Sequence, residues 1–288
     1  MLYTPVNEFN WEATNFADAF GSTTNSTLLT ASGTAHVKGA DASVMVGLAE
    51  DCYGMILCFF SGSTVTTIRR QMVDLLIDPA AGVGNAGASW TVLINNLFTG
   101  NPSVLVGKSG HKFYFPLFLK AGTAIGARTQ DTVIDATVRL AIKVFGKPTH
   151  PELVKFGTSV QTMGADTATT AGITVVPGVS SVYGSYSATY GTLARDAWWW
   201  QLGYGLNDSS MSDGRQAWDI AHDTTAKILC AQGIESSAVS AEETVKEAFG
   251  HRLPIRCASA GSSVYVRALT TNSTADSGYS AVVYAVGE

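Results

Sequence analysis

GHKFYFPLFLKAGTAIGARTQ, residues 110–130, and GHRLPIRCASAGSSVYVRALT, residues 250–270, are two versions of one segment. Each opens on glycine, histidine and a cation, carries a proline in an apolar run, and contains Ala-Gly followed seven residues later by arginine. Both copies continue into an alternating apolar strand that ends at a glycine. The shared order of residue types indicates an internal duplication. The matched positions are Pro116 and Pro254, Ala121-Gly122 and Ala260-Gly261, and Arg128 and Arg267.

The repeated Ala-Gly and proline also predict local structure. We expect each Ala-Gly to form the tight turn into the next strand, because glycine allows a positive φ angle. Each proline lacks the N–H that a central strand needs, so its strand should lie at a sheet edge or begin after the proline.

The duplication extends upstream through the motif Arg-Gln-x-x-Asp, which runs from Arg70 to Asp74 and again from Arg215 to Asp219. An apolar or aromatic stretch precedes each motif, GMILCFF in the first copy and WWWQLGYG in the second. The offset between the copies is 145 residues at this motif (215 − 70) and 139 at the Ala-Gly (260 − 121). A difference in loop length explains the change, because loops tolerate insertions and deletions.

The sequence therefore predicts two units in tandem, at 31–147 and 152–288, after a polar N-terminal arm at 1–30. Between the units lies Lys-Pro-Thr-His-Pro, and two prolines so close together break both helix and sheet. Short alternating or apolar segments bounded by Gly, Ser and Pro fill most of the chain, including the Ser- and Tyr-rich stretch SVYGSYSATY at 181–190. This pattern predicts an all-β protein of two tandem β-sandwiches. A jelly roll is the first expectation, and an immunoglobulin-like sandwich is the alternative.

The composition restricts the classes of function. Charged residues make up 14% of the 288 residues and hydrophobic residues 46%, against roughly 25% charged residues in average proteins. So little charge favours a protein that buries much of its outer surface against other subunits, although an exposed surface rich in Ser, Thr and Gly would also explain it. The net charge of −5 and the lack of a basic patch argue against nucleic-acid binding.

Neither a secretory signal nor a membrane segment is expected. The N-terminus has no cationic start followed by an apolar core. No apolar run approaches the ~20 residues that a membrane helix needs. We therefore expect a soluble protein that is made in the cytoplasm and has no membrane partner.

No sequence pattern points to catalysis, a cofactor or a metal. The chain has no Gly-x-Ser-x-Gly elbow and no phosphate loop. Its five histidines are scattered and lack the spacing of metal ligands. Its four cysteines form no Cys-x-x-Cys pair, so we expect reduced, mostly buried thiols. The expectation is a protein that is not an enzyme and holds no cofactor.

The repeated charged residues have two interpretations. Asp74 and Asp219 are matched between the copies, and so are Arg128 and Arg267. An Arg–Asp pair within each unit would be structural. Alternatively, the planar guanidinium could grip a carboxylate or a sugar acid. The structural interpretation is favoured.

The triplet Trp198-Trp199-Trp200 is the most distinctive local feature. In a strand, Trp198 and Trp200 share one face and Trp199 takes the other. One face would be covered by the core, and the other by a partner subunit, a neighbouring domain or a ligand. An interface is the first interpretation, and a platform on which sugar rings stack is the second. Tyr204 lies in the same stretch and adds to either surface.

The segment HKFYFPLFLKAGTAIGARTQ, with SWTVLINNLFTG and RQMVDLLID before it, resembles a domain in virion proteins of tailed bacteriophages and gene transfer agents. The resemblance covers about 60–150 well and the second half weakly, where the Trp triplet and the shortened HRLP segment depart from it. It implies a structural component of the particle, in the head, neck, baseplate or fibre and spike, and it brings no catalytic residues. The expected partners are copies of itself and other virion proteins. The alternative is a carbohydrate-binding module for a host-surface glycan.

Overall fold

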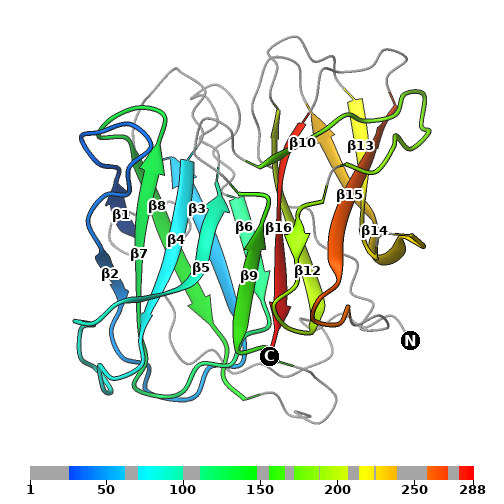
Figure 1. The fold of residues 1–288 in the computed structure, drawn as a ribbon. Coiled ribbons are helices and arrows are strands. Elements are labelled where there is room, and N and C mark those ends of the chain that lie inside the picture. Colours follow the sequence, from blue (N-terminus) through cyan, green and yellow to red (C-terminus); the bar gives the residue numbers. More distant parts are fainter. Residues whose placement is uncertain are drawn as a thin grey trace.

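The computed structural model describes residues 26–61, 71–99, 111–147, 156–165, 172–187, 189–206, 214–223, 225–238, 258–271 and 279–288. Within these residues the chain forms sixteen strands and no helix (Figure 1). Most of the predicted N-terminal arm, residues 1–25, lies outside the described residues, as do Arg70, Pro254 and most of the proline-rich segment between the units. The all-β prediction is confirmed.

The first unit is an eight-stranded sandwich of two antiparallel sheets. One sheet has the order β1-β8-β3-β6 and the other β2-β7-β4-β5. Successive strands thus cross between the sheets except at the β4–β5 hairpin, which is the winding of a jelly roll. The strands are β1 (Thr27–Thr30), β2 (Ala42–Met45), β3 (Met55–Ser61), β4 (Gln71–Asp78), β5 (Thr91–Phe98), β6 (His111–Phe115), β7 (Ala124–Asp131) and β8 (Thr137–Val144).

The second unit repeats this winding. One sheet has the order β11-β15-β13-β14, which matches β2-β7-β4-β5, and in the other β16 lies between β12 and a pair of short strands, β9 and β10. β9 and β10 pair with opposite ends of β16 and together take the place of β1. The strands are β9 (Ser159–Met163), β10 (Ile173–Val175), β11 (Gly191–Thr192), β12 (Ala197–Leu206), β13 (Gly214–His222), β14 (Ile228–Ala238), β15 (Ser263–Thr270) and β16 (Tyr279–Gly287). The counterpart of β6 in the repeat falls outside the described residues.

Two local expectations differ from the structure. The arm was expected to reach residue 30, but Thr27–Thr30 already forms β1 beside β8, because Leu29 enters the first core. The stretch 181–190 was expected to be a strand, but its described residues form none. Ser180 and Ser181 adopt positive φ angles of 54° and 65°, which break an extended path.

The repeated turn residues behave as the sequence predicts. Gly122 and Gly261 have φ angles of 86° and 84°, a region open to glycine at no steric cost. Each therefore allows the tight turn that leads into the next strand, β7 or β15. Pro116 directly follows β6, which is an edge strand of its sheet, where a missing N–H leaves no gap in a ladder.

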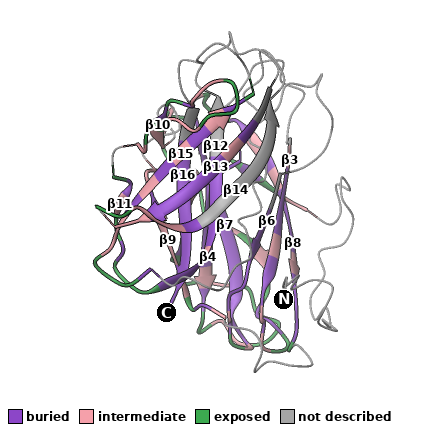
Figure 2. Ribbon diagram, turned by 90° about the vertical axis from the view of Figure 1, so that its right-hand side faces the viewer, coloured by how far each residue is buried: buried purple, intermediate pink, exposed green. Residues whose placement is uncertain are grey.

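Strand β16 belongs to two hydrophobic cores at once. Val282, Tyr284 and Val286 point into the core of the first unit, among residues of β3 to β8. The residues between them, Ala281, Val283 and Ala285, point into the core of the second unit. All are buried (Figure 2). Because side chains alternate along a strand, one strand joins both cores and lies between them (Figure 1).

The first unit offers β16 an opening between its edge strands β5 and β6. The ring of Tyr284 lies edge-on to Phe113 and Phe115 of β6 at centroid distances of 5.8 and 6.3 Å. Its hydroxyl accepts the Phe98 N–H at 2.7 Å and donates to the Asn96 carbonyl at 2.8 Å, both on β5. The second unit therefore satisfies backbone groups of the first unit as well as its apolar surface.

The burial of β16 in the first core is large on the scale of protein stability. Burying one Val or Tyr side chain contributes about 1.5–3 kcal/mol, so the three side chains together contribute about 5–9 kcal/mol. A whole domain is stable by about 5–15 kcal/mol. Gly203 of β12 permits the close approach, since a Cβ there would lie 3.1 Å from Phe98 Cβ and from the Tyr284 hydroxyl.

Tyr284→Phe should destabilise the protein by about 1–3 kcal/mol, because it leaves the buried Phe98 N–H without an acceptor. Urea unfolding monitored by fluorescence measures this as a lower midpoint at unchanged slope. Tyr53→Phe is the matched control. The Tyr53 ring packs edge-on against Phe118 and Phe156, and we expect a change within about 0.5 kcal/mol. Equal effects of the two variants would contradict the role given to the Tyr284 hydroxyl.

Candidate functional site

The tryptophan triplet lies at the junction of the two units. Trp200 points into the second core and is 4% exposed, while Trp199 packs against the first core. The Trp199 ring meets Tyr114 of β6 edge-on at 5.6 Å. Trp198 sits at a β-bulge and is 6% exposed. The neighbouring unit of the same chain is therefore what covers the second face of this strand.

This burial bears on the sugar-stacking interpretation. A sugar ring needs an open aromatic face, and the buried rings of Trp198 and Trp200 have none to offer. Next along β12, the Gln201 amide donates to the Tyr114 carbonyl on the free edge of β6. The side chain of Tyr204 lies outside the described residues, although its backbone belongs to β12. The described part of this stretch thus joins the units.

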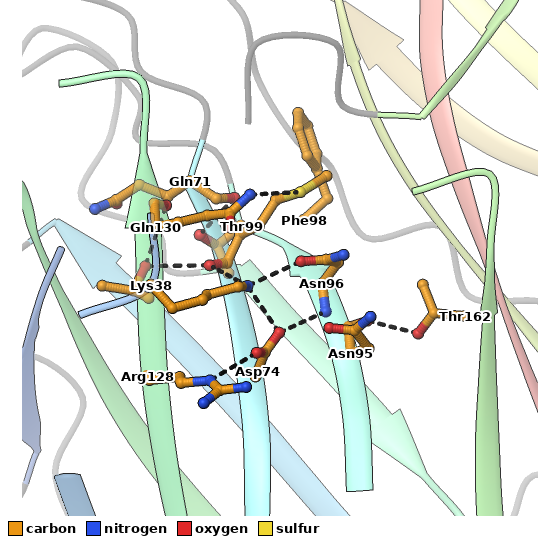
Figure 3. Close-up of polar contacts among 12 residues, drawn as sticks. Lys38, Gln71, Asp74, Asn95, Asn96, Phe98, Thr99, Arg128, Gln130 and Thr162 are labelled. Atoms are coloured by element: carbon orange, nitrogen blue, oxygen red, sulfur yellow. Dashed lines mark hydrogen bonds and ion pairs between the residues drawn. The ribbon is translucent and has the colours of Figure 1, made fainter. Parts of the chain in front are cut away.

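The predicted Arg–Asp pair is present in the first unit, on the outer face of the sheet β2-β7-β4-β5. Asp74 and Arg128 lie opposite each other in register on β4 and β7, and the Arg128 Nε donates to Asp74 Oδ2 at 2.9 Å. Lys38 donates to Asp74 Oδ1 at 2.7 Å and to Asn96 Oδ1 at 2.8 Å (Figure 3). Burial lowers the pKa of Lys38, and its contact with Asp74 opposes that shift.

The second unit contains the same pair with a different third member. Asp219 and Arg267 lie opposite each other on β13 and β15, and the Arg267 Nε donates to Asp219 Oδ2 at 2.8 Å. Where the first unit uses Lys38, here Tyr183 donates its hydroxyl to Asp219 Oδ1 at 2.9 Å. The Arg267 guanidinium lies over the rings of Tyr183 and Tyr186, with its Cζ 4.4 and 4.8 Å from their centroids. Burial and the bond to Asp219 raise the pKa of Tyr183, which keeps it protonated as a donor.

In both units the third member comes from the segment that follows the first strand. In the first unit this segment runs along β7, where the Gly39 N–H donates to the Thr129 carbonyl. In the second it runs along β15, where the Gly184 N–H donates to the Ala268 carbonyl. In each unit the Arg–Asp pair thus fixes the segment that crosses from the first strand to the opposite sheet. Of the other matched arginines, Arg70 lies outside the described residues, and only the backbone of Arg215, in β13, is described.

Two further aspartates per unit are matched, and the sequence motifs described above do not include them. Asp51 Oδ1 accepts the Ala121 N–H at 2.8 Å, and Asp196 Oδ1 accepts the Ala260 N–H at 2.8 Å. Each carboxylate therefore fixes the Ala-Gly turn of its own unit. The sequence signal is Leu-Ala-x-Asp at 48–51 and 193–196, with the same offset of 145 (196 − 51).

The third matched pair caps the turn after the Arg-Gln-x-x-Asp strand. Asp78 accepts the N–H groups of Ala80, Ala88 and Ser89, and Asp223 accepts those of Thr225 and Ala226. These bonds lower the pKa of both carboxyls, with the Ser89 bond contributing most at Asp78 and the Thr225 bond at Asp223. The longer motif Arg-Gln-x-x-Asp-x-x-x-Asp would have revealed them, again at an offset of 145 (223 − 78).

A cleft of about 400 Å³ opens between the units. Ile77, Val92 and Leu93 of the first unit line it opposite β9, the 193–197 turn and the end of β16. Gln161 holds the turn, since its Nε2 donates to the Thr192 carbonyl and its Oε1 accepts the Ala194 N–H. Arg195 and Asp196 are the charged residues in its lining.

Among the described residues, no group of side chains forms an arrangement to which we assign catalysis. Among them no group of three or more His, Cys, Asp or Glu is placed to hold a metal ion. Cys52, Cys58 and Cys230 are reduced, buried thiols, as expected, and Cys257 lies outside the described residues. Burial raises the pKa of Cys52 to about 11, which keeps it a thiol. In the described part of the chain, no helix is long and apolar enough to span a bilayer.

Comparison with known proteins gives weak likenesses of fold. No family profile matches the sequence, and no curated protein matches it. The tandem CBM22-1–CBM22-2 domain of Paenibacillus barcinonensis Xyn10C is 10% identical at a TM-score of 0.26, over 97% of this chain and 92% of that one. The STIV major capsid protein is 9% identical at 0.32, over 91% and 95%. PNGase F, a glycosylasparaginase from Flavobacterium meningosepticum, is 10% identical at 0.24, over 97% and 94%. At such TM-scores these likenesses carry no argument about function.

Asp219→Asn should lower the stability of the protein by about 1–3 kcal/mol, because it weakens the hydrogen bonds from Arg267 and Tyr183 to a buried acceptor. Asp74→Asn should do the same in the first unit. Asp135→Asn makes the same change at an exposed residue and should stay within about 0.5 kcal/mol. Thermal and urea unfolding measure all three variants. A loss no larger than that of Asp135→Asn would remove the structural role of the pairs.

The double variant Asp78→Asn/Asp223→Asn should flatten the acid limb of the stability–pH curve. Both carboxyls have a lower pKa in the folded protein than the unfolded value of about 3.9. Their contribution is therefore fully present above about pH 5 and is lost as the pH falls through the folded pKa. Urea midpoints between pH 2.5 and pH 7 measure the slope, with Asp135→Asn as the control. An unchanged slope in the double variant would contradict the capping role.

Proposed function

We propose that this chain is a structural component of a virus particle, a building block that assembles with copies of itself and with other particle proteins. The observation that carries the proposal is a duplicated jelly roll in which the described matched residues hold the turns and sheets of their own unit together. Jelly rolls occur in viral capsid and lectin domains. A fold alone does not decide function, which lies in what the site residues do.

The use made of the described charged residues supports a building block. Asp51, Asp74, Asp78 and their three counterparts in the second unit accept hydrogen bonds from their own unit. The low charge of the chain, 14%, suits a protein that covers its outside with neighbouring subunits. Large exposed side chains such as Val83 and Val182, at 60% and 66%, are candidates for such contacts.

The narrower version of the proposal is a tailed-phage-type particle. It rests on the resemblance of 60–150 to virion domains of tailed phages and gene transfer agents, and the duplicated fold does not depend on it. The chain would act in the virion after synthesis in the host cytoplasm. The alternative, a module for a host-surface glycan, would need aromatic residues other than Trp198 and Trp200, which are buried.

The purified full-length chain should form a defined oligomer at micromolar concentration and be present, by mass spectrometry and immunogold labelling, in particles released by the cells that encode it. Light scattering after gel filtration measures the oligomer. Val83→Asp and Val182→Asp should shift it towards the monomer, while Lys120→Asp, an exposed turn residue, serves as the control. A chain that stays monomeric and is absent from the particles would refute the proposal. A hit on a glycan array without assembly would favour the alternative.

A further inference from the structure

The first unit is completed by a strand that is distant in the sequence. Its own last strand, β8, ends at Val144, and β16 begins at Tyr279, 135 residues later (279 − 144). Val282, Tyr284 and Val286 nevertheless belong to the core of the first unit. The residues between β8 and β16 carry the rest of the second unit. The first core is therefore complete only when nearly all of the second unit is present.

Without β16 the opening between β5 and β6 would expose the interior of the first unit. Phe98 and Leu97 of β5 and Phe113 and Phe115 of β6 are all buried members of that core. Two of these rings lie against Tyr284, and the Phe98 N–H uses the Tyr284 hydroxyl as its acceptor. An open first unit would thus present aromatic surface and an unpaired N–H to water at the same place.

The second unit depends on the same strand in a different way. β16 is hydrogen-bonded to β12 on one side and to β9 and β10 on the other, so it is the central strand of its sheet. Ala281, Val283 and Ala285 supply its contribution to the second core. Loss of β16 would separate β12 from β9 and β10. One strand therefore closes two sandwiches, and neither has a substitute for it among the described residues.

We propose that docking of β16 couples the folding of the two units, and we call this role of β16 the lock. Neither sandwich reaches its native packing until the strand at 279–287 docks, and the two units then fold and unfold as one cooperative body although the sequence reads as two tandem domains. A chain that lacks this strand therefore does not reach the native state. The inference holds whether or not the chain belongs to a virus particle, because it concerns the single chain.

Neighbouring residues of β16 provide a matched pair of variants for the test. Val282 and Val283 are both fully buried, lie side by side on the strand and face the first and the second core respectively. Val282→Ala and Val283→Ala remove the same atoms. Native-state hydrogen exchange on the full-length chain measures the exchange rates of the backbone amides of β4 in the first unit and of β13 in the second. Val46→Ala makes the same change at a residue that is 50% exposed and lies outside the cleft between the units, and it serves as the control.

A lock predicts that either variant speeds exchange in β4 and in β13 alike, by roughly ten- to a hundredfold for a buried Val→Ala change, while Val46→Ala changes neither. Independent units predict that Val282→Ala affects β4 only and Val283→Ala affects β13 only, and that result would overturn the proposal. Because the readout belongs to the single chain, it is independent of whether particles form.

Pulsed hydrogen exchange during refolding of the full-length chain tests the order of events. Amides of β4 and β5 should become protected at the same rate as those of β16. Native-level protection of β4 while β16 still exchanges freely would show that the first sandwich closes alone, and the lock would be refuted. This measurement also decides the matter if either alanine variant fails to fold.

Discussion

A strand buried on both faces imposes the main constraint on this molecule. Most strands of a sandwich offer one face to a core and the other to solvent, but β16 has a core on each side. The alternation expected for this strand is therefore wrong for the second copy: in SAVVYAVG, residues on both faces of the strand are apolar. The Trp triplet of β12, the glycine that lets β12 approach β5, and the Tyr284 hydroxyl all follow from bringing a second sandwich against the open side of the first.

Within each unit, aspartate carboxylates hold turns and strands in place, and their spacing in the sequence is the same in the two units. Three aspartates occupy matched positions in the two units: one fixes the Ala-Gly turn, one pairs with arginine across the sheet, and one caps the turn after β4 or β13. In a chain with so few charges, each of these six carboxylates has a defined structural partner. The chemistry around the central one differs, since a lysine in the first unit is replaced by a tyrosine hydroxyl in the second.

Part of this could be predicted from the sequence. Repeated motifs gave the duplication, the all-β fold, the glycine turns and the cross-strand Arg–Asp pairs, because each depends on residues close in sequence or matched between the copies. The covering of Trp199 by Tyr114 could not be predicted, since an apolar pattern shows that a face is buried but not what buries it. The sequence favours a strand at 181–190, because its composition does not reveal the positive φ angles of Ser180 and Ser181. The short Leu-Ala-x-Asp match stands out only once the turns that it holds are known.

The register of the two sheets reveals how the copies have diverged. In β8 Ile142 lies opposite Leu57, and in β16 Val283 lies opposite Leu202, so Lys143 of the first unit corresponds to Tyr284 of the second. The first copy keeps a half-buried cation where the second carries the ring that enters its neighbour. A lysine can face water but a buried aromatic ring needs a covering neighbour, so a cut between the units would expose an aggregation-prone aromatic patch on the second unit but not at the matched position of the first.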